Sequence, residues 1–185
     1  RWAPAMMLAY MTCDIGAHHN RAWAITYDVA KGREEVEGKA AKVIELQRIR
    51  PSFDLLGACR LQWVEIGFEF EHYPDMFEAV TGRKMTVEEL YEATDRVWNL
   101  TRTRAFLEVP GFGRDFDYPP PRFYEEPIPT GPGKGKMLTL VQLDFMLDDY
   151  YAKRGWDAKG KPTRATLERL GLGKCVQDLE GKGLL

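Results

Sequence analysis

Two stretches of the sequence carry a complete helix start signal followed by an apolar repeat. Thr86 and Glu89 form a capping-box pattern, and Thr139 with Gln142 forms a second one. In such a box the side chains at both positions satisfy backbone N–H groups of the first helical turn. The apolar residues that follow have helical spacing: Leu90, Ala93, Val97, Leu100 and Ala105 after the first box, and Leu143, Met146, Leu147 and Tyr150 after the second. Two amphipathic helices are therefore predicted, the second ending at Gly155.

Other patterns without a capping box predict helices in much of the remaining chain, the first of them amphipathic. These segments are residues 34–50, 74–81 and 163–170. Pro51 is expected to end the first of them because proline lacks the N–H donor that continues a helix. Residues 2–13 are small and apolar, which predicts a buried helix or strand, and Trp63, Ile66 and Phe68 are expected to face the core. Because no strand alternation is convincing, the predicted fold class is all-α, a multihelical region with one long irregular arm.

Residues 108–136 form the predicted arm. Seven of the eleven prolines and five glycines fall within this range, which forbids a regular helix. Its aromatic residues supply too much apolar surface for a disordered linker: Phe112, Phe116, Tyr118, Phe123 and Tyr124. Arg114 and Arg122 are candidate anion ligands, although salt bridges are the commoner fate of such residues. Residues 1–185 are taken as one helical region that divides, if at all, near 108–136.

Composition excludes several classes of function. A formal net charge of -2 supplies no basic field for nucleic acid. No apolar run approaches the roughly 18 residues of a membrane helix, and the N-terminus lacks a signal-peptide layout, so a cytoplasmic protein is expected. Three widely spaced cysteines argue against a disulfide framework. The chain starts inside an apolar pattern without methionine, which predicts a piece of a longer protein.

Two short loops carry the candidate chemistry. The first, Asp14-Ile-Gly-Ala-His-His-Asn-Arg21, contains His18 and His19, while Asp14 and Asn20 can instead cap neighbouring helices. A zinc site from Cys13 and the two histidines lacks a well-spaced fourth ligand. The second loop is Asp54-Leu-Leu-Gly-Ala-Cys59. Asp54 is expected to start a segment, as a cap or a ligand contact, and Cys59 is a core cysteine, a nucleophile or a metal ligand.

The second loop resembles the DxxGxC motif of the tungsten-dependent aldehyde:ferredoxin oxidoreductase family. The match extends through Ala9-Tyr-Met-Thr-Cys-Asp-Ile-Gly-Ala-His-His-Asn-Arg21, which is similar to the family's loop ending in a G-A-C-H-type sequence. Together the similar segments extend over essentially the whole chain. Further segments occur in the family's order: Val80-Thr-Gly82, Arg96-Val-Trp-Asn-Leu-Thr-Arg102, Glu126-Pro-Ile-Pro-Thr-Gly-Pro-Gly-Lys-Gly135 and Tyr150-Tyr-Ala-Lys-Arg-Gly-Trp156. Such an ordered set is more specific than any single motif.

This resemblance implies a C-terminal helical region that binds cofactors together with N-terminal domains of the same protein. The cofactors would be a tungsten (or molybdenum) bis-pterin and a 4Fe–4S cluster. Cys59 matches the fourth cluster ligand, the other three coming from an upstream CxxCxxxC motif outside this chain. Asp54 matches the carboxylate that accepts hydrogen bonds from the pterin, and Gly57 would let the backbone approach it. Ala58 replaces a frequent leucine of the motif.

The resemblance also implies an activity, the oxidation of a small aldehyde to a carboxylic acid with ferredoxin as electron acceptor. His19 aligns with the family's histidine and His18 occupies its usual cysteine position, so both are candidate catalytic groups. The chain alone is expected to be inactive, and a homo-oligomer is compatible with the family. Two alternatives stay open: a low-potential aromatic-ring (benzoyl-CoA-type) reductase subunit of the same family, and a cofactor-free helical binding module.

Overall fold

The computed structural model describes residues 1–65 and 67–185. Within those ranges it is all-α, as predicted, and contains no β-strand. The helices are α1 (Pro4–Met11), α2 (Ile25–Lys31), α3 (Lys39–Leu56), α4 (Leu61–Glu65), α5 (Tyr73–Thr81), α6 (Val87–Glu108), α7 (Arg122–Glu125), α8 (Leu140–Arg154), α9 (Arg164–Arg169) and α10 (Gly173–Gly181). Short 3₁₀ turns lie at η1 (His19–Arg21), η2 (Phe70–His72) and η3 (Arg114–Asp117).

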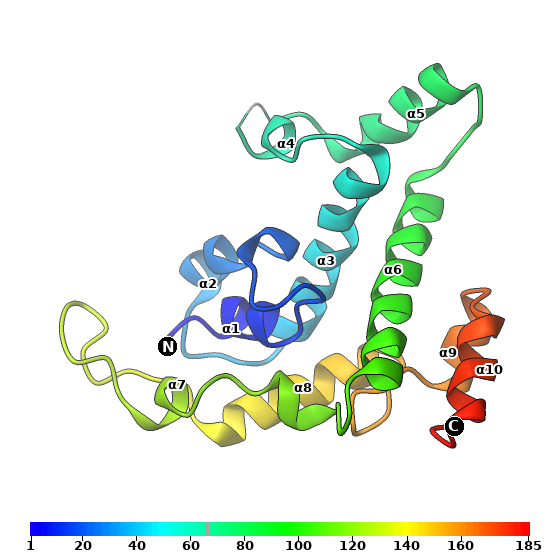
Figure 1. Ribbon diagram of the computed structural model, residues 1–185. Helices are drawn as coiled ribbons and strands as arrows, with labels where there is room; N and C mark the ends of the chain where they lie inside the picture. Colours follow the sequence, from blue (N-terminus) through cyan, green and yellow to red (C-terminus); the bar gives the residue numbers. More distant parts are fainter. Residues whose placement is uncertain (66) are drawn as a thin grey trace.

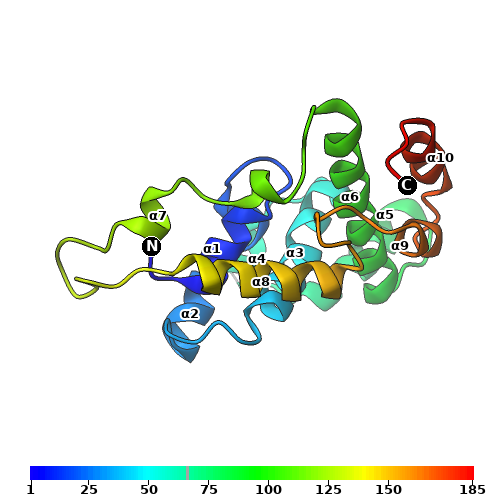
Figure 2. The ribbon, with the colours of Figure 1, turned by 90° about the horizontal axis from the view of Figure 1, so that it is seen from below.

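Helices α3 and α6 pack side by side and form the centre of the molecule (Figure 1). Helix α8 crosses beneath them and also contacts α1 (Figure 2). The main core lies where α1, α3 and α8 meet, with Leu8, Val43 and Leu147 fully buried. A second core joins the C-terminal half of α3 to α5 and α6 through Phe53, Tyr73 and other aromatic residues. Helix α3 therefore contributes to both cores.

The two capping boxes are present where the sequence predicts them. The Thr86 hydroxyl accepts from the Glu89 N–H at 3.1 Å, and the Glu89 carboxylate accepts from the Thr86 N–H at 2.7 Å. Thr139 and Gln142 make the same reciprocal pair at the start of α8. These contacts satisfy N–H groups that a helix start leaves without partners. Both long amphipathic helices are confirmed.

The prediction that Pro51 ends a helix is wrong. Helix α3 starts only after Gly38, whose φ of 74° is left-handed, and it continues through Pro51 to Leu56. Proline leaves the carbonyl of Gln47, four residues earlier, without its usual donor. The indole N–H of Trp98 on α6 donates to that carbonyl at 2.7 Å. The helix continues because a neighbouring helix replaces the missing hydrogen bond.

The side chain of Gln47 extends this junction to two more helices. Its Nε2 donates to the Thr12 hydroxyl at 3.0 Å just after α1. Its Oε1 accepts from the Tyr150 hydroxyl at 2.6 Å and from Arg154 Nη2 at 2.8 Å, both on α8. Gln47 is fully buried, so each of these polar groups would be costly to leave without a partner. The four hydrogen bonds fix the positions of α1, α3, α6 and α8 relative to one another.

Among the helices that the sequence patterns do not predict are α2 and α10. Asp28 of α2 is buried and accepts from the N–H groups of Ala5 and Met6, so α2 caps the start of α1. Helix α10 forms within the glycine-punctuated tail, where Cys175, Val176 and Leu179 share one buried face. That face packs against α9 and α6. Both helices owe their position to contacts with remote parts of the chain.

The 108–136 arm is ordered, as predicted, but it is not free of helix: the short helix α7 and the turn η3 lie within it. Helix α7 starts directly after Pro121, because a proline is tolerated at a helix start, where no N–H donor is needed. Tyr118 and Tyr124 pack against the main core. Arg114 pairs with Asp144 at 3.0 Å and with Asp148 at 2.6 Å, and Arg122 pairs with Glu126 at 2.9 Å. Both arginines therefore form ion pairs within the chain, which is the commoner of the two expected roles.

The segment after α3 bears out two of the three predicted core contacts. Trp63 and Phe68 are half-buried and pack against the second core. The third, Ile66, lies outside the described residues.

Replacing Trp98 with Phe should test the junction at Pro51. The change removes the donor to the Gln47 carbonyl, so the free energy of unfolding should fall by about 1–3 kcal/mol, plus a packing loss. Pro51→Ala restores an N–H to the helix and should make the same Trp98→Phe change less costly. Chemical denaturation of the four proteins of this cycle measures the coupling. If Trp98→Phe lowers the free energy of unfolding equally in the unchanged protein and in the Pro51→Ala protein, the Trp98 indole does not replace the N–H donor that Pro51 lacks.

Candidate functional site

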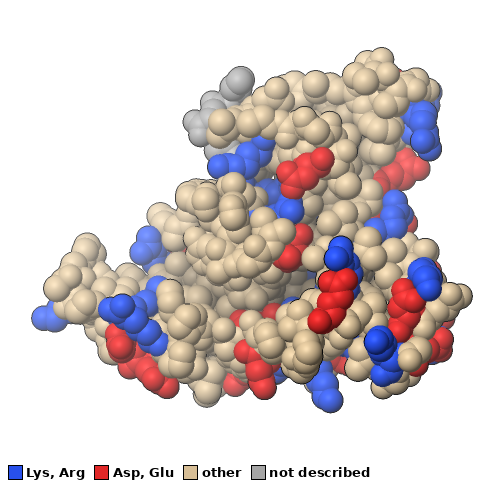
Figure 3. Space-filling model, in the orientation of Figure 1, with Lys and Arg blue, Asp and Glu red and all other residues tan. Residues whose placement is uncertain are grey.

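The end of α3 and the loop between α1 and α2 enclose a cavity of about 380 Å³, here called the α3-end cavity. Its walls come from two segments that lie far apart in the sequence. The lining residues are Ile15, His18, Asn20, Arg21, Arg50, Phe53, Asp54, Ala58, Cys59 and Arg60. On the face seen in Figure 3, side chains of both charge signs meet in the hollow below α4. The two loops singled out in the sequence therefore form one site.

The turn that ends α3 places Cys59 at the surface. Gly57 adopts a left-handed conformation with φ of 66°, which a side chain would strain. The N–H of Ala58 then donates to the carbonyl of Phe53 at 2.8 Å, a bond that closes the helix. Beyond this turn Cys59 is exposed, so it is not the core cysteine that one interpretation allowed. Its thiol is accessible and could ligate a metal centre whose other ligands come from elsewhere.

Asp54 lies in the last turn of α3 and does not start a helix, which corrects the prediction of an N-terminal cap. Because α3 continues through Pro51, the N–H groups near Asp54 are already bonded within the helix. Its side chain is 69% exposed and pairs with Arg21. Arg21 also pairs with Asp14 at 3.0 Å, and the Asp14 side chain is 4% exposed. Arg21 thus joins the α1–α2 loop to the end of α3.

The electrostatics of Asp14 depend on this arginine. Burial raises the pKa of the Asp14 carboxyl above its ordinary value, and the charge of Arg21 partly offsets that rise. The alternative interpretation of this loop, in which Asp14 and Asn20 cap helices while one histidine bonds to the backbone, is wrong for the two caps and confirmed for the histidine. The Nδ1 atom of His18 accepts from the Asn20 N–H at 3.0 Å and caps η1.

The two histidines occupy different places. His18 lines the α3-end cavity, whereas His19 is not among its lining residues. Their rings stack at a centroid distance of 5.1 Å and an angle of 7°, and His19 meets Trp23 edge-on at 5.4 Å. Burial and the charges of His18, Arg60 and Arg50 lower the pKa of His19. The cavity therefore brings together His18, Asp54, Ala58 and Cys59, with Gly57 in the adjoining turn.

The sequence analysis missed Arg50, which lines the same cavity. Arg50 is 3% exposed, and its Nε and Nη1 atoms have no hydrogen-bond partner among the described residues. Burial, and secondly the charge of Arg60, lower the pKa of Arg50 to about 10. In sequence Arg50 is one charged residue within an amphipathic pattern. No local signal distinguishes it, because its burial depends on residues outside its own helix, such as Trp63, whose ring centre lies 5.4 Å from the guanidinium.

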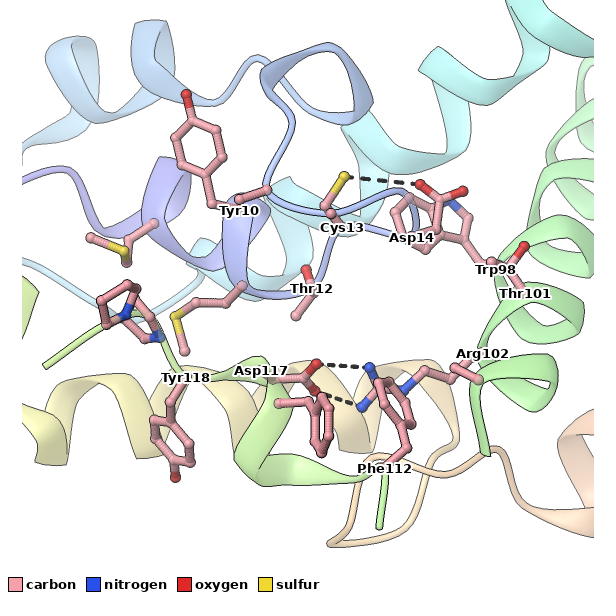
Figure 4. A pocket seen from close by; sticks show the side chains of 18 of the residues that line it. Tyr10, Thr12, Cys13, Asp14, Trp98, Thr101, Arg102, Phe112, Asp117 and Tyr118 are labelled. Carbon is pink, nitrogen blue, oxygen red and sulfur yellow. Dashed lines mark hydrogen bonds and ion pairs between the residues drawn. The ribbon is translucent and has the colours of Figure 1, made fainter. Parts of the chain in front are cut away.

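A larger cavity of about 770 Å³ lies between α1, α6 and the 108–136 arm (Figure 4). Its walls are mainly apolar and aromatic. Arg102 crosses one side of it and holds Asp117 through two bonds of 2.7 and 2.6 Å. Cys13 lines this cavity and not the α3-end cavity. Among the side chains that the structure describes, no three His, Cys, Asp or Glu form a group that could hold a metal ion.

The donors at the α3-end cavity fit the cofactors that the sequence motifs imply. Cys59 offers one exposed thiol, which suits a cluster whose remaining ligands come from elsewhere. Asp54 offers a largely exposed carboxylate, which suits the N–H donors of a pterin. The buried Nε and Nη1 atoms of Arg50, which have no hydrogen-bond partner among the described residues, would suit an anionic group.

Comparisons with known proteins identify the family. The family model "Aldehyde ferredoxin oxidoreductase, domains 2 & 3" matches residues 1–172, so the chain belongs to the aldehyde ferredoxin oxidoreductase family. It is 30% identical over 178 residues to the tungsten-containing aldehyde ferredoxin oxidoreductase of Pyrococcus furiosus, and 29% identical over 182 residues to that of Thermococcus kodakarensis. These alignments cover 93% and 95% of the chain but only 28% and 29% of the relatives. The chain matches their C-terminal part.

Two further similarities are to proteins named for other activities. The chain is 34% identical over 115 residues to an aliphatic sulfonate oxidoreductase, WOR-like subunit, of Pyrococcus furiosus, covering 60% of the chain and 18% of the relative. A solved structure of the active site complex BamBC of benzoyl coenzyme A reductase, in complex with 1,5-dienoyl-CoA, matches with a TM-score of 0.63 and 25% identity. That match covers 81% of the chain and 21% of the solved chain. The chain therefore shares its fold with part of that solved chain.

Replacing Arg21 with Gln should destabilise the protein in a pH-dependent way. Without Arg21 the pKa of Asp14 should rise further above the unfolded value of 3.8. Between those two pKa values the folded state binds more protons than the unfolded state, so stability falls as pH rises. The loss should be small near pH 4 and about 2 kcal/mol at pH 7.

Thermal unfolding at both pH values measures this loss. Arg122→Gln is a matched control, because Arg122 is 68% exposed in its pair with Glu126 and should matter little at either pH. An Arg21→Gln loss that is equal at pH 4 and pH 7 would exclude Asp14 as its source.

Proposed function

We propose that the chain is part of a tungsten (or molybdenum) pterin oxidoreductase that oxidises aldehydes to carboxylic acids and delivers electrons to ferredoxin in the cytoplasm. The observation that carries this proposal is the α3-end cavity, where Asp54, Cys59 and His18 meet although 41 positions separate the first and last in sequence. Family membership supports the same assignment. Since the chain covers under a third of its relatives, the remaining ligands and domains would come from the rest of the protein.

The residues present would divide the binding of the cofactors between them. Cys59 would supply one thiolate to a 4Fe–4S cluster, and Asp54 would accept hydrogen bonds from the pterin. Gly57 keeps the turn between them narrow, and Ala58 leaves room where the family often has leucine. Arg21 would orient the Asp54 carboxylate. The metal and pterin supply the two-electron chemistry when they are bound.

The histidines can handle the protons of the reaction. Aldehyde and water give a carboxylic acid, two electrons and two protons, so a group near the reacting carbon must donate or accept protons. The Nδ1 atom of His18 accepts a hydrogen bond, so the neutral ring carries its proton on Nε2. His18 can therefore donate to an oxygen atom in the cavity. His19, whose lowered pKa favours the neutral form, is positioned beside it as a second proton group.

Replacing Cys59 with Ala in the full-length protein tests the cluster assignment. Iron content and cluster absorbance should be lost, because the other three ligands leave one iron without its thiolate. Cys175→Ala is a matched control, since Cys175 is buried in α10 and should leave iron unchanged. Unchanged iron in the Cys59→Ala protein would reject the assignment.

Metal analysis and aldehyde-dependent dye reduction test the activity of the full-length protein. Tungsten or molybdenum should be present after expression in a competent host, and dye reduction should require an aldehyde. Absence of both metals would reject the proposal and favour a cofactor-free helical module, an alternative that the presence of both Asp54 and Cys59 speaks against.

A second candidate is a low-potential aromatic-ring reductase subunit of the same family. Its support is the similarity to the benzoyl coenzyme A reductase complex, together with His18 at the position of the family's usual cysteine. A substrate screen distinguishes the two candidates, because an aromatic coenzyme A thioester in place of an aldehyde would be the substrate of such a reductase.

A further inference from the structure

Arg50 differs from the other buried arginines of the chain. Arg102 is paired with Asp117 at 2.6 Å, and Arg154 is paired with Asp95 at 3.0 Å. Arg50 is 3% exposed, yet no carboxylate pairs with it among the described residues. Its guanidinium lies 5.4 Å from the centre of the Trp63 ring, which gives only a modest cation–π attraction. A buried charge without a partner costs several kcal/mol.

The cavity next to Arg50 has an excess of positive charge. Arg21, Arg50 and Arg60 line it, and its one lining carboxylate, Asp54, is already paired with Arg21. The lowered pKa of Arg50, about 10, still leaves the guanidinium charged at neutral pH. Arginine keeps its charge under this degree of burial better than lysine would. The arrangement is that of an anion site whose anion is supplied from outside these residues.

We propose that Arg50 is the counter-charge of the anionic iron–sulfur cluster that Cys59 would ligate, and that it raises the cluster's reduction potential. This inference rests on the proposed function. Four thiolates give such a cluster a net negative charge, which grows by one when the cluster takes an electron. A fixed positive charge at the wall of the same cavity stabilises the reduced form more than the oxidised form. Arg50 would therefore act through charge, without ligating iron.

Arg50→Met in the full-length protein tests the inference. The EPR signal of the reduced cluster, followed in a redox titration, should show a reduction potential shifted to more negative values at full iron content. Arg50→Lys keeps a charge and should recover most of the shift. Arg50→Gln provides a second neutral side chain if the Met variant does not accumulate.

Arg48→Met is a matched control on the same helix. Arg48 pairs with Glu88 and Asp95 at 3.0 Å each and does not line the cavity, so its removal should leave the potential unchanged. An equal shift of the reduction potential in the Arg48→Met protein would mean that the effect comes from the overall charge of the protein. That result would overturn the assignment.

The remaining outcomes also decide the matter. Loss of the cluster from the Met and Gln variants but not from the Lys variant would support the counter-charge, whereas loss from all three would overturn it. An unchanged reduction potential in the Arg50→Met protein overturns the proposal too. If that variant also contains less tungsten, Arg50 would be assigned to an anionic group of the pterin. Iron that persists in the Cys59→Ala protein would instead reject the proposed function itself.

Discussion

The hydrogen bond from the Trp98 indole to the Gln47 carbonyl is the interaction on which the rest of the structure depends. It supplies the donor that Pro51 lacks, so α3 continues for another turn and a half beyond the expected stop. The side chain of Gln47 fastens the same point to Thr12, Tyr150 and Arg154. One fully buried residue thus connects four helices.

The candidate site is a consequence of that continued helix. The last turns of α3 carry Arg50 inward and Asp54 outward, and the left-handed Gly57 then exposes Cys59. Arg21 binds the opposite loop to this helix end through Asp14 and Asp54. A helix that ended at Arg50 would leave the two loops without a common wall. The geometry of the site is therefore set by packing at some distance from it.

Charge is distributed unequally over the molecule. At the helix junctions every buried cation has its carboxylate, as with Lys39 and Asp28 at 3.1 Å. At the α3-end cavity the arginines outnumber the available carboxylates. Stability alone does not favour such an arrangement, because an unpaired buried charge is costly. On the proposed function, the compensating anion would come from the bound cofactor.

The sequence by itself determined the all-α class, the two capped helices, the ordered arm and the loops that carry the site, because their signals lie within a few residues of each other. Asp54 and Cys59 are identified through resemblance to the family's DxxGxC motif, supported by further segments in the family's order, and not from the six residues alone. Only the tertiary structure decided that α3 passes Pro51, that α10 forms, that His18 and not His19 lines the cavity, and that Arg50 is buried there. Each of these depends on a partner remote in sequence, such as Trp98 for Gln47, which lies 51 positions away. The spacing of apolar residues within one segment does not identify partners that are remote in sequence.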